Sequence, residues 1–160
     1  MLTLSRRRML LGLACFSGFG PLLAFADKPA AEAPKLETFT GKVVPLADLV
    51  AKTGSKLDLD AAPHSLVLIT DDGKAYTVVK DSGGRLFFKD PELLNRPMRL
   101  TGKLLPGSQI LEITLAQSLI KGEPNEIYYW CDICSIRRSE KMVCECCGGG
   151  MQRHEEPVKN

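Results

Sequence analysis

The sequence has few of the features that mark the common enzyme classes. Its 160 residues include only two histidines and 6% aromatic residues. After residue 26 there is no G-x-S-x-G, H-E-x-x-H, Walker or G-x-G-x-x-G pattern. The only long apolar stretch lies at the N-terminus, which argues against a membrane bundle. A hydrophobic share of 44% argues against a mostly disordered chain, so we expect one compact, non-enzymatic domain with a small appendage.

A strong charge of one sign is also missing. The chain has 21 Lys and Arg residues against 19 Asp and Glu residues. Residues 1–26 hold three of the basic residues and no acidic one, which leaves 18 against 19 and a formal charge of −1 for the rest. A near-neutral chain gives no electrostatic reason to expect nucleic acid as a partner.

The first 26 residues have the three parts of an export signal. A basic run at 5–8 (SRRR) precedes a largely apolar stretch at 9–25, and Ala24 and Ala26 have the spacing that signal peptidases accept. We therefore predict that 1–26 is a cleaved signal peptide and that the protein is periplasmic or secreted. No membrane-spanning segment is expected in the mature chain.

The basic run also resembles a twin-arginine export signal. Residues 5–10 (SRRRML) follow the pattern Ser-Arg-Arg, any residue, a large apolar residue and Leu, with Arg6 and Arg7 as the arginine pair. The resemblance implies that the protein folds, and takes up any cofactor, before export. An ordinary export signal with a basic start is the alternative, because charge alone accounts for three arginines.

A short leader precedes a region in which apolar and polar residues alternate. Residues 27–36 are rich in Ala and Pro and predict a flexible leader, whereas residues 37–121 predict a β-domain. The sequences at 71–73 (DDG) and 106–108 (PGS) indicate hairpin turns. We expect strands over 38–44, 65–70, 75–80, 97–105 and 109–120, a short strand or an extension of the preceding strand over 85–89, a helical turn at 46–50, and a helix capped by Asp90 with Pro91 at its first position.

The element order in this domain is strand, strand, strand, helix, strand, strand. It resembles the oligonucleotide/oligosaccharide-binding (OB) fold, a small five-stranded Greek-key barrel with one short helix. The resemblance implies a binding surface on the barrel for a protein or small molecule that the sequence does not identify. Another small barrel or a single meander sheet is the alternative, and either is also mainly β.

Every cysteine after the signal peptide lies within residues 127–151. They form two C-x-x-C pairs and one additional residue: Cys131 with Cys134, Cys144 with Cys147, and Cys146. Two pairs give four thiolates, the number that fills a tetrahedral zinc site. Gly148 follows the second pair and permits the positive φ that such a turn often needs. We therefore predict a small four-cysteine hairpin similar to a zinc ribbon.

The same stretch resembles the short heavy-metal-binding module of copper-efflux and related exported proteins. That module has an aromatic residue, two cysteine pairs, and a Gly-Met after the last cysteine. The matching positions are Tyr129, Cys131, Cys134, Cys144, Cys147, Gly148 and a displaced Met151. Glu145 stands in place of the module's proline. The resemblance implies an exported protein in which copper or another heavy metal is the cargo.

Other donors near the pairs keep copper(I) open as an alternative metal. Cys146, Met151 and His154 supply soft or imidazole donors close to the four cysteines. His154 falls in residues 152–160, which we expect to be an exposed polar tail.

Two further interpretations involve no metal. An oxidising compartment would allow disulfides, although five cysteines leave one thiol unpaired. The spacing of Cys131 and Cys134 is also that of thiol-disulfide oxidoreductases, but no βαβ pattern surrounds it.

Overall fold

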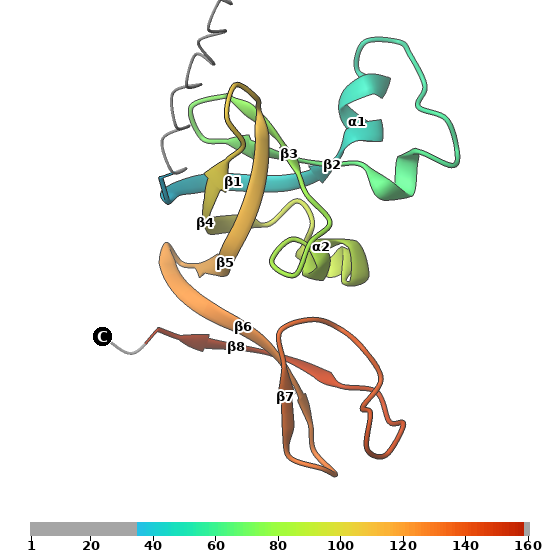
Figure 1. Ribbon diagram of the computed structural model, residues 1–160, viewed down its shortest axis with the longest axis vertical. Coiled ribbons are helices and arrows are strands. Elements are labelled where there is room, and N and C mark those ends of the chain that lie inside the picture. The colour runs from blue at the N-terminus through green and yellow to red at the C-terminus, as the bar shows by residue number, and fades with distance from the viewer. Residues whose placement is uncertain (1–34, 159–160) are drawn as a thin grey trace, which may run out of the picture. The chain divides into compact units, whose positions relative to one another are not determined.

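The computed structural model describes residues 35–158 of the chain (Figure 1). The predicted signal peptide, with Arg6, Arg7, Ala24 and Ala26, and most of the predicted leader lie outside these residues. Within residues 35–158, no helix has the length and apolar character needed to span a bilayer.

The described part of the chain is mainly β, as predicted. In order, its elements are β1 (Glu37–Pro45), α1 (Leu46–Ala51), the 3-10 helix η1 (Ala62–His64), β2 (Leu66–Thr70), β3 (Ala75–Val78), α2 (Arg85–Lys89), the 3-10 helix η2 (Pro91–Leu93), β4 (Pro97–Leu104), β5 (Ile110–Ile120), β6 (Glu123–Cys131), β7 (Ile136–Arg138) and β8 (Gln152–Pro157). Both predicted hairpin turns are present, between β2 and β3 and between β4 and β5.

Five of the strands close into a ring. β1 pairs antiparallel with β2 and β4, β2 pairs with β3, and β4 pairs with β5. A short parallel pairing of β3 with β5, at Thr77–Ile110 and Val78–Leu111, completes the circuit. The order β1-β2-β3-β5-β4, with α2 between β3 and β4, is the arrangement expected of a small Greek-key barrel. A single meander sheet is excluded because β1 pairs with β4.

Alternating residues of the ring strands form its core. In β1, Phe39 and Val43 are buried while the residues between them, apart from Gly41, face outward. Leu68, Leu100 and Leu111 from three other strands are completely buried in the same cluster. Period-two burial of this kind is what the alternation in the sequence predicts for a sheet with one face on the core.

The prediction of a strand at 85–89 is wrong, because this segment forms α2. The Asp81 carboxylate accepts hydrogen bonds from the backbone N–H groups of Gly83 and Gly84, at 3.1 and 2.8 Å, and so stabilises the turn that begins the helix. Leu86 and Phe87, which are adjacent in sequence, are both buried against the barrel. Strand alternation would place them on opposite faces.

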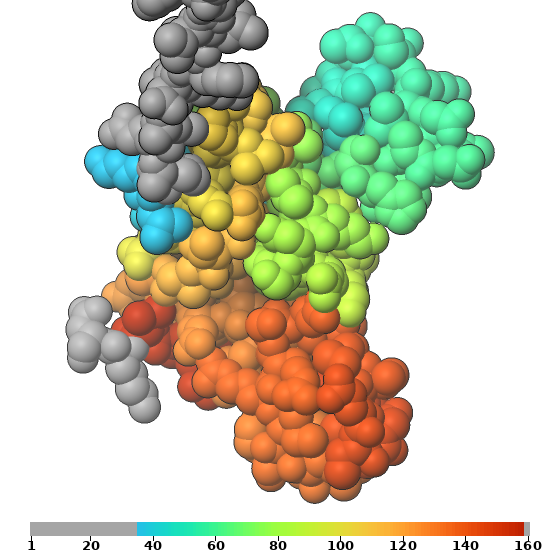
Figure 2. All heavy atoms as spheres, in the orientation of Figure 1, coloured from blue at the N-terminus to red at the C-terminus, as the bar shows by residue number. Residues whose placement is uncertain are grey.

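The connection between β1 and β2 projects from the barrel. It contains α1, which confirms the predicted helical turn, and η1 (Figures 1 and 2). No side chain of α1 is buried. The helix predicted after Asp90 is only the single turn η2, although Asp90 does cap it, with its carboxylate 3.4 Å from the Glu92 nitrogen.

The barrel continues directly into the cysteine-rich region through a tight hairpin. Lys121 (φ 54°) and Gly122 (φ 85°) form a two-residue turn, and β6 pairs with the end of β5. The prediction of an exposed polar tail over 152–160 is wrong for Gln152–Pro157, which form β8 and pair with β6 over six residues. We call residues 123–158 the cysteine module.

Candidate metal centre

The two cysteine pairs lie on two turns of the same geometry. In the first, the Ser135 N–H donates to the Cys131 carbonyl at 2.8 Å; in the second, the Gly148 N–H donates to the Cys144 carbonyl at 2.8 Å. The residue after each pair has a positive φ, 53° for Ser135 and 70° for Gly148. The prediction for Gly148 is confirmed. Ser135 carries no comparable sequence signal, because serine rarely adopts this conformation.

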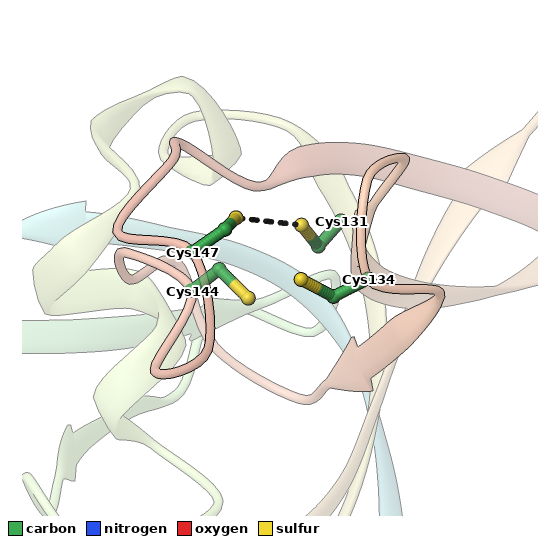
Figure 3. A group of neighbouring side chains, drawn as sticks. All are labelled: Cys131, Cys134, Cys144 and Cys147. Atoms are coloured by element: carbon green, nitrogen blue, oxygen red, sulfur yellow. Dashed lines mark hydrogen bonds between the residues drawn. The ribbon is translucent and has the colours of Figure 1, made fainter.

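The two turns direct all four sulfurs toward one point (Figure 3). The Sγ atoms of Cys131, Cys134, Cys144 and Cys147 all lie within 4.8 Å of one another, and those of Cys131 and Cys147 are 3.6 Å apart. Zinc–sulfur bonds of about 2.3 Å in a tetrahedron require sulfur–sulfur distances of roughly 3.8 Å. The four thiols are therefore spaced closely enough to hold one metal ion.

The second turn stabilises a thiolate. The backbone N–H groups of Cys147, and then of Cys146, hydrogen-bond the Cys144 sulfur and lower its pKa to about 7, although burial opposes them. In the first turn the backbone N–H of Cys134 also lowers the pKa of the Cys131 thiol. Burial and the thiols of Cys144 and Cys147 together have a larger effect in the other direction, so the pKa of Cys131 is raised overall. Metal ligands of this type bind as thiolates, so amides aimed at sulfur favour binding.

The site has a buried side and an exposed side. Cys131 and Cys144 are each 2% exposed, Cys134 is half-buried and Cys147 is exposed. The first turn connects β6 to β7, which pair through three residues on either side of it. The second turn lies in a loop that is held by an isolated bridge between Val143 and Gly150, by the hydrogen bond from the Cys144 N–H to the Gly149 carbonyl, and by the ion pair of Glu145 with Arg138 of β7.

The additional candidate ligands lie in three different settings. Cys146 is exposed and lies outside the four-sulfur group. Met151 is buried in the hydrophobic cluster that also contains Cys131 and Cys144. His154 lies on β8, where its ring stacks on Tyr128 with centroids 5.2 Å apart and an interplanar angle of 11°. All five cysteines of the described chain are free thiols.

A buried ion-pair network joins the module to the barrel. Asp90, at the end of α2, is 0% exposed and accepts a hydrogen bond from the Tyr129 hydroxyl at 2.7 Å. Arg153 of β8 donates to the same carboxylate at 2.7 Å, and the Lys141 ammonium is 3.4 Å away. Burial opposes ionisation of Asp90, but these donors together lower its pKa. From sequence Asp90 is recognisable only as a helix cap, because its partners are 39 to 63 residues away.

The basic residues between the cysteine pairs contact carboxylates rather than the sulfurs. Arg137 pairs with Glu126, and Arg138 pairs with Glu145 at 2.8 Å. Arg137 also lies over the Tyr128 ring, 4.0 Å from its centroid. These contacts fit a solvated hairpin.

The barrel offers few aromatic side chains for stacking on a nucleic-acid base. Tyr76 and Phe87 are buried, and only Phe88 is half-buried. The strongest functional feature of the described chain is thus the four-cysteine cluster. Comparisons of the chain with protein-family models, curated proteins and solved structures found no match.

Proposed function

We propose that this chain is an exported, non-enzymatic protein in which four cysteines hold one structural zinc ion. The observation that carries the proposal is the convergence of the four sulfurs of Cys131, Cys134, Cys144 and Cys147 within 4.8 Å. The barrel would then provide a surface for a protein or small-molecule partner. Export is proposed from residues 1–26 alone.

Zinc suits this site for two reasons. Four thiolates complete a tetrahedral zinc centre and leave no coordination position for a substrate or water, so a structural role follows. The module also has little apolar core, since Ile127, Tyr129 and Met151 are its only buried hydrophobic residues apart from two of the cysteines. A domain with so small a core commonly depends on a metal for its stability.

The decisive experiment measures metal content and free thiols on the same sample. Protein purified without chelators is analysed by elemental mass spectrometry, and thiols are titrated before and after denaturation in chelator. We expect about one zinc ion per chain, with the four ligand thiols reacting only after denaturation. A chain with no metal and few free thiols would instead contain disulfides, and the proposal would be wrong.

A matched pair of variants tests which thiols hold the ion. Cys144→Ser removes a buried member of the cluster and should abolish stoichiometric binding, because three thiolates and a hydroxyl form a much weaker zinc site. Cys146→Ser removes the exposed thiol outside the cluster and should leave one ion per chain. Equal metal content in the two variants would contradict the assignment.

Copper(I) cargo is the second candidate. The observation that favours it is the exposure of Cys147, with another exposed thiol, Cys146, next to it. Soft thiolates select copper(I) as well as zinc. In this case the purified protein would contain substoichiometric metal that exchanges with thiol competitors while the barrel remains folded.

A further inference from the structure

The connection from β1 to β2, residues 46–65, is the longest in the barrel. Its two ends are held together, since the Leu46 N–H donates to the Ser65 carbonyl at 2.9 Å. Its helix α1 stands beside the barrel and has no buried side chain (Figure 1). Long connections of this kind commonly carry function rather than stabilise a core. This one forms a wall of a cleft that lies away from the cysteine module.

The cleft lies between α1 and the outer face of β1 and β2, and its volume is about 470 Å³. Its floor is apolar and consists of Val44, Leu49 and Ile69, each of which is half-buried. Val44 and Ile69 each follow a core residue in their strand, so they face away from the barrel core. An apolar cleft of this size is the usual form of a small-ligand site.

Charged side chains of both signs surround this floor. They are Lys42, Lys52, Asp48 and Asp71, and all four are exposed. Within residues 35–158, none of these side chains forms a hydrogen bond or an ion pair, so the opposite charges of the cleft do not neutralise one another. An ion of a single sign would be attracted by two of them and repelled by the other two. The charge pattern therefore suits a ligand that carries one positive and one negative group.

Asn95 adds a neutral polar group to the cleft, from the segment before β4. Its φ of 61° is uncommon for residues other than glycine, and its backbone N–H donates to the Val43 carbonyl at 2.8 Å. The backbone position of Asn95 is thus fixed, whereas its exposed side-chain amide has no hydrogen-bond partner among the described residues. A side-chain amide can both donate and accept, and a peptide group offers the matching acceptor and donor.

We infer that this cleft binds a short apolar peptide with free termini, of which a dipeptide is the smallest. The inference rests on the proposed role of the barrel as a binding surface and is independent of the metal site. An apolar side chain of the peptide packs on the floor of the cleft, and its peptide group pairs with the Asn95 amide. The terminal ammonium group contacts the aspartates and the terminal carboxylate contacts the lysines.

A dipeptide fits this charge pattern better than a single amino acid does. In a free amino acid both charged groups are attached to one carbon atom, whereas the cations and anions of the cleft are too far apart to pair with one another. A dipeptide separates its two termini by about two residue lengths, roughly 7 Å. It can therefore contact charges of both signs while its side chains cover the apolar floor.

The test is isothermal titration calorimetry of the purified full chain with dileucine and three blocked forms of it. Acetylation removes the positive charge of dileucine, amidation removes the negative charge, and the doubly blocked form has neither. We expect dileucine to bind with a Kd below about 1 mM, and each blocked terminus to weaken binding about fivefold. Zinc content is measured on the same samples.

A matched pair of variants tests whether the cleft is the site of binding. Lys42→Gln/Lys52→Gln removes both lysines of the cleft and should weaken dileucine binding about fivefold. It should not weaken the binding of dileucine amide, because that form has no carboxylate. Lys35→Gln/Lys56→Gln is the control, since it removes two exposed lysines outside the cleft and should leave all four affinities at the wild-type value.

Four results would overturn this inference. The first is no binding of any form, and the second is equal affinity for all four forms, which would leave only an apolar surface. The third is tighter binding of a singly blocked form, which would indicate a site for an ion of one sign. The fourth is equal weakening in the two double variants, which would assign the effect to net charge. Failure of the proposed metal site is distinguishable from all of these, because wild-type protein would then contain no stoichiometric zinc, whatever the calorimetry shows.

Discussion

The barrel and the cysteine module are stabilised in different ways, although they share one sheet. The barrel has a continuous apolar core drawn from all five ring strands and α2. The module contributes only a few residues to that core, and two of them, Cys131 and Cys144, belong to the proposed metal site. Hydrophobic burial can stabilise the first region unaided, whereas the second region needs ligand bonds and polar contacts with the barrel.

Removal of metal should produce the largest difference between the two regions. We expect a strong chelator to unfold the module and leave the barrel folded, because structural zinc sites contribute about 10–16 kcal/mol in small metal-dependent domains. Trp130 is the only tryptophan and lies in β6 beside Cys131, so its fluorescence reports on the module alone. Hydrogen exchange should show protection lost in β6 and β7 and retained in β1 and β4. An unchanged Trp130 signal after metal loss would contradict this division.

A cavity in the barrel core should destabilise the barrel and leave metal binding by the module unchanged. Leu100→Ala removes a completely buried side chain of β4 and should lower the free energy of unfolding by about 2–5 kcal/mol, measured by denaturant unfolding. Zinc content should stay at the wild-type value. The matched control is Leu115→Ala on β5, where the side chain is 45% exposed and we expect a change within about 0.5 kcal/mol. Loss of zinc from Leu100→Ala would show that the site depends on the barrel core.

The buried carboxylate that links the two regions should have an intermediate effect. Asp90→Asn removes a charged acceptor from Tyr129 and Arg153 and should cost about 2 kcal/mol at neutral pH. In the folded protein the pKa of Asp90 is below its ordinary value of 3.8, so its charge stabilises the fold above that pH. That contribution is lost as the pH falls through the folded pKa. The difference in unfolding free energy between wild type and Asp90→Asn should therefore narrow below pH 3.8, and a constant difference would rule out a role for the charge.

The smallest expected effects come from the two equivalent turns of the site. Gly148→Ala adds a methyl group with no neighbouring atom within 4 Å, so only the backbone cost of φ 70° applies. We expect a loss of about 1 kcal/mol, or about a fivefold weaker zinc affinity in a competition titration. Ser135→Gly relieves the same cost at φ 53° and should strengthen binding by a similar factor. Changes of the same sign in both variants would contradict the equivalence of the turns.

Local patterns in the sequence predict most of the barrel and the chemistry of the site. Alternation over 38–44 and hairpin signals at 71–73 and 106–108 lie within single elements or tight turns, where neighbouring residues determine conformation. The two C-x-x-C pairs likewise identify the four cysteines that can bind a metal. Gly148 identifies one of the two turns that bring their sulfurs together. Segments of mixed pattern are less predictable. Residues 85–89 suit a strand as well as a helix until the hydrogen bonds of Asp81 in the preceding turn and the burial of two adjacent side chains are known.

The sequence alone therefore determines which residues can bind a metal, because that depends on side-chain chemistry and short spacing. Tertiary structure alone decides where the exposed side of the site lies and how the module contacts the barrel. The polar segment Gln152–Pro157 becomes a strand only because β6 has a free edge for it to pair with. Asp90, Tyr129 and Arg153 meet only when three distant segments are brought together, and no local pattern records a contact of that range.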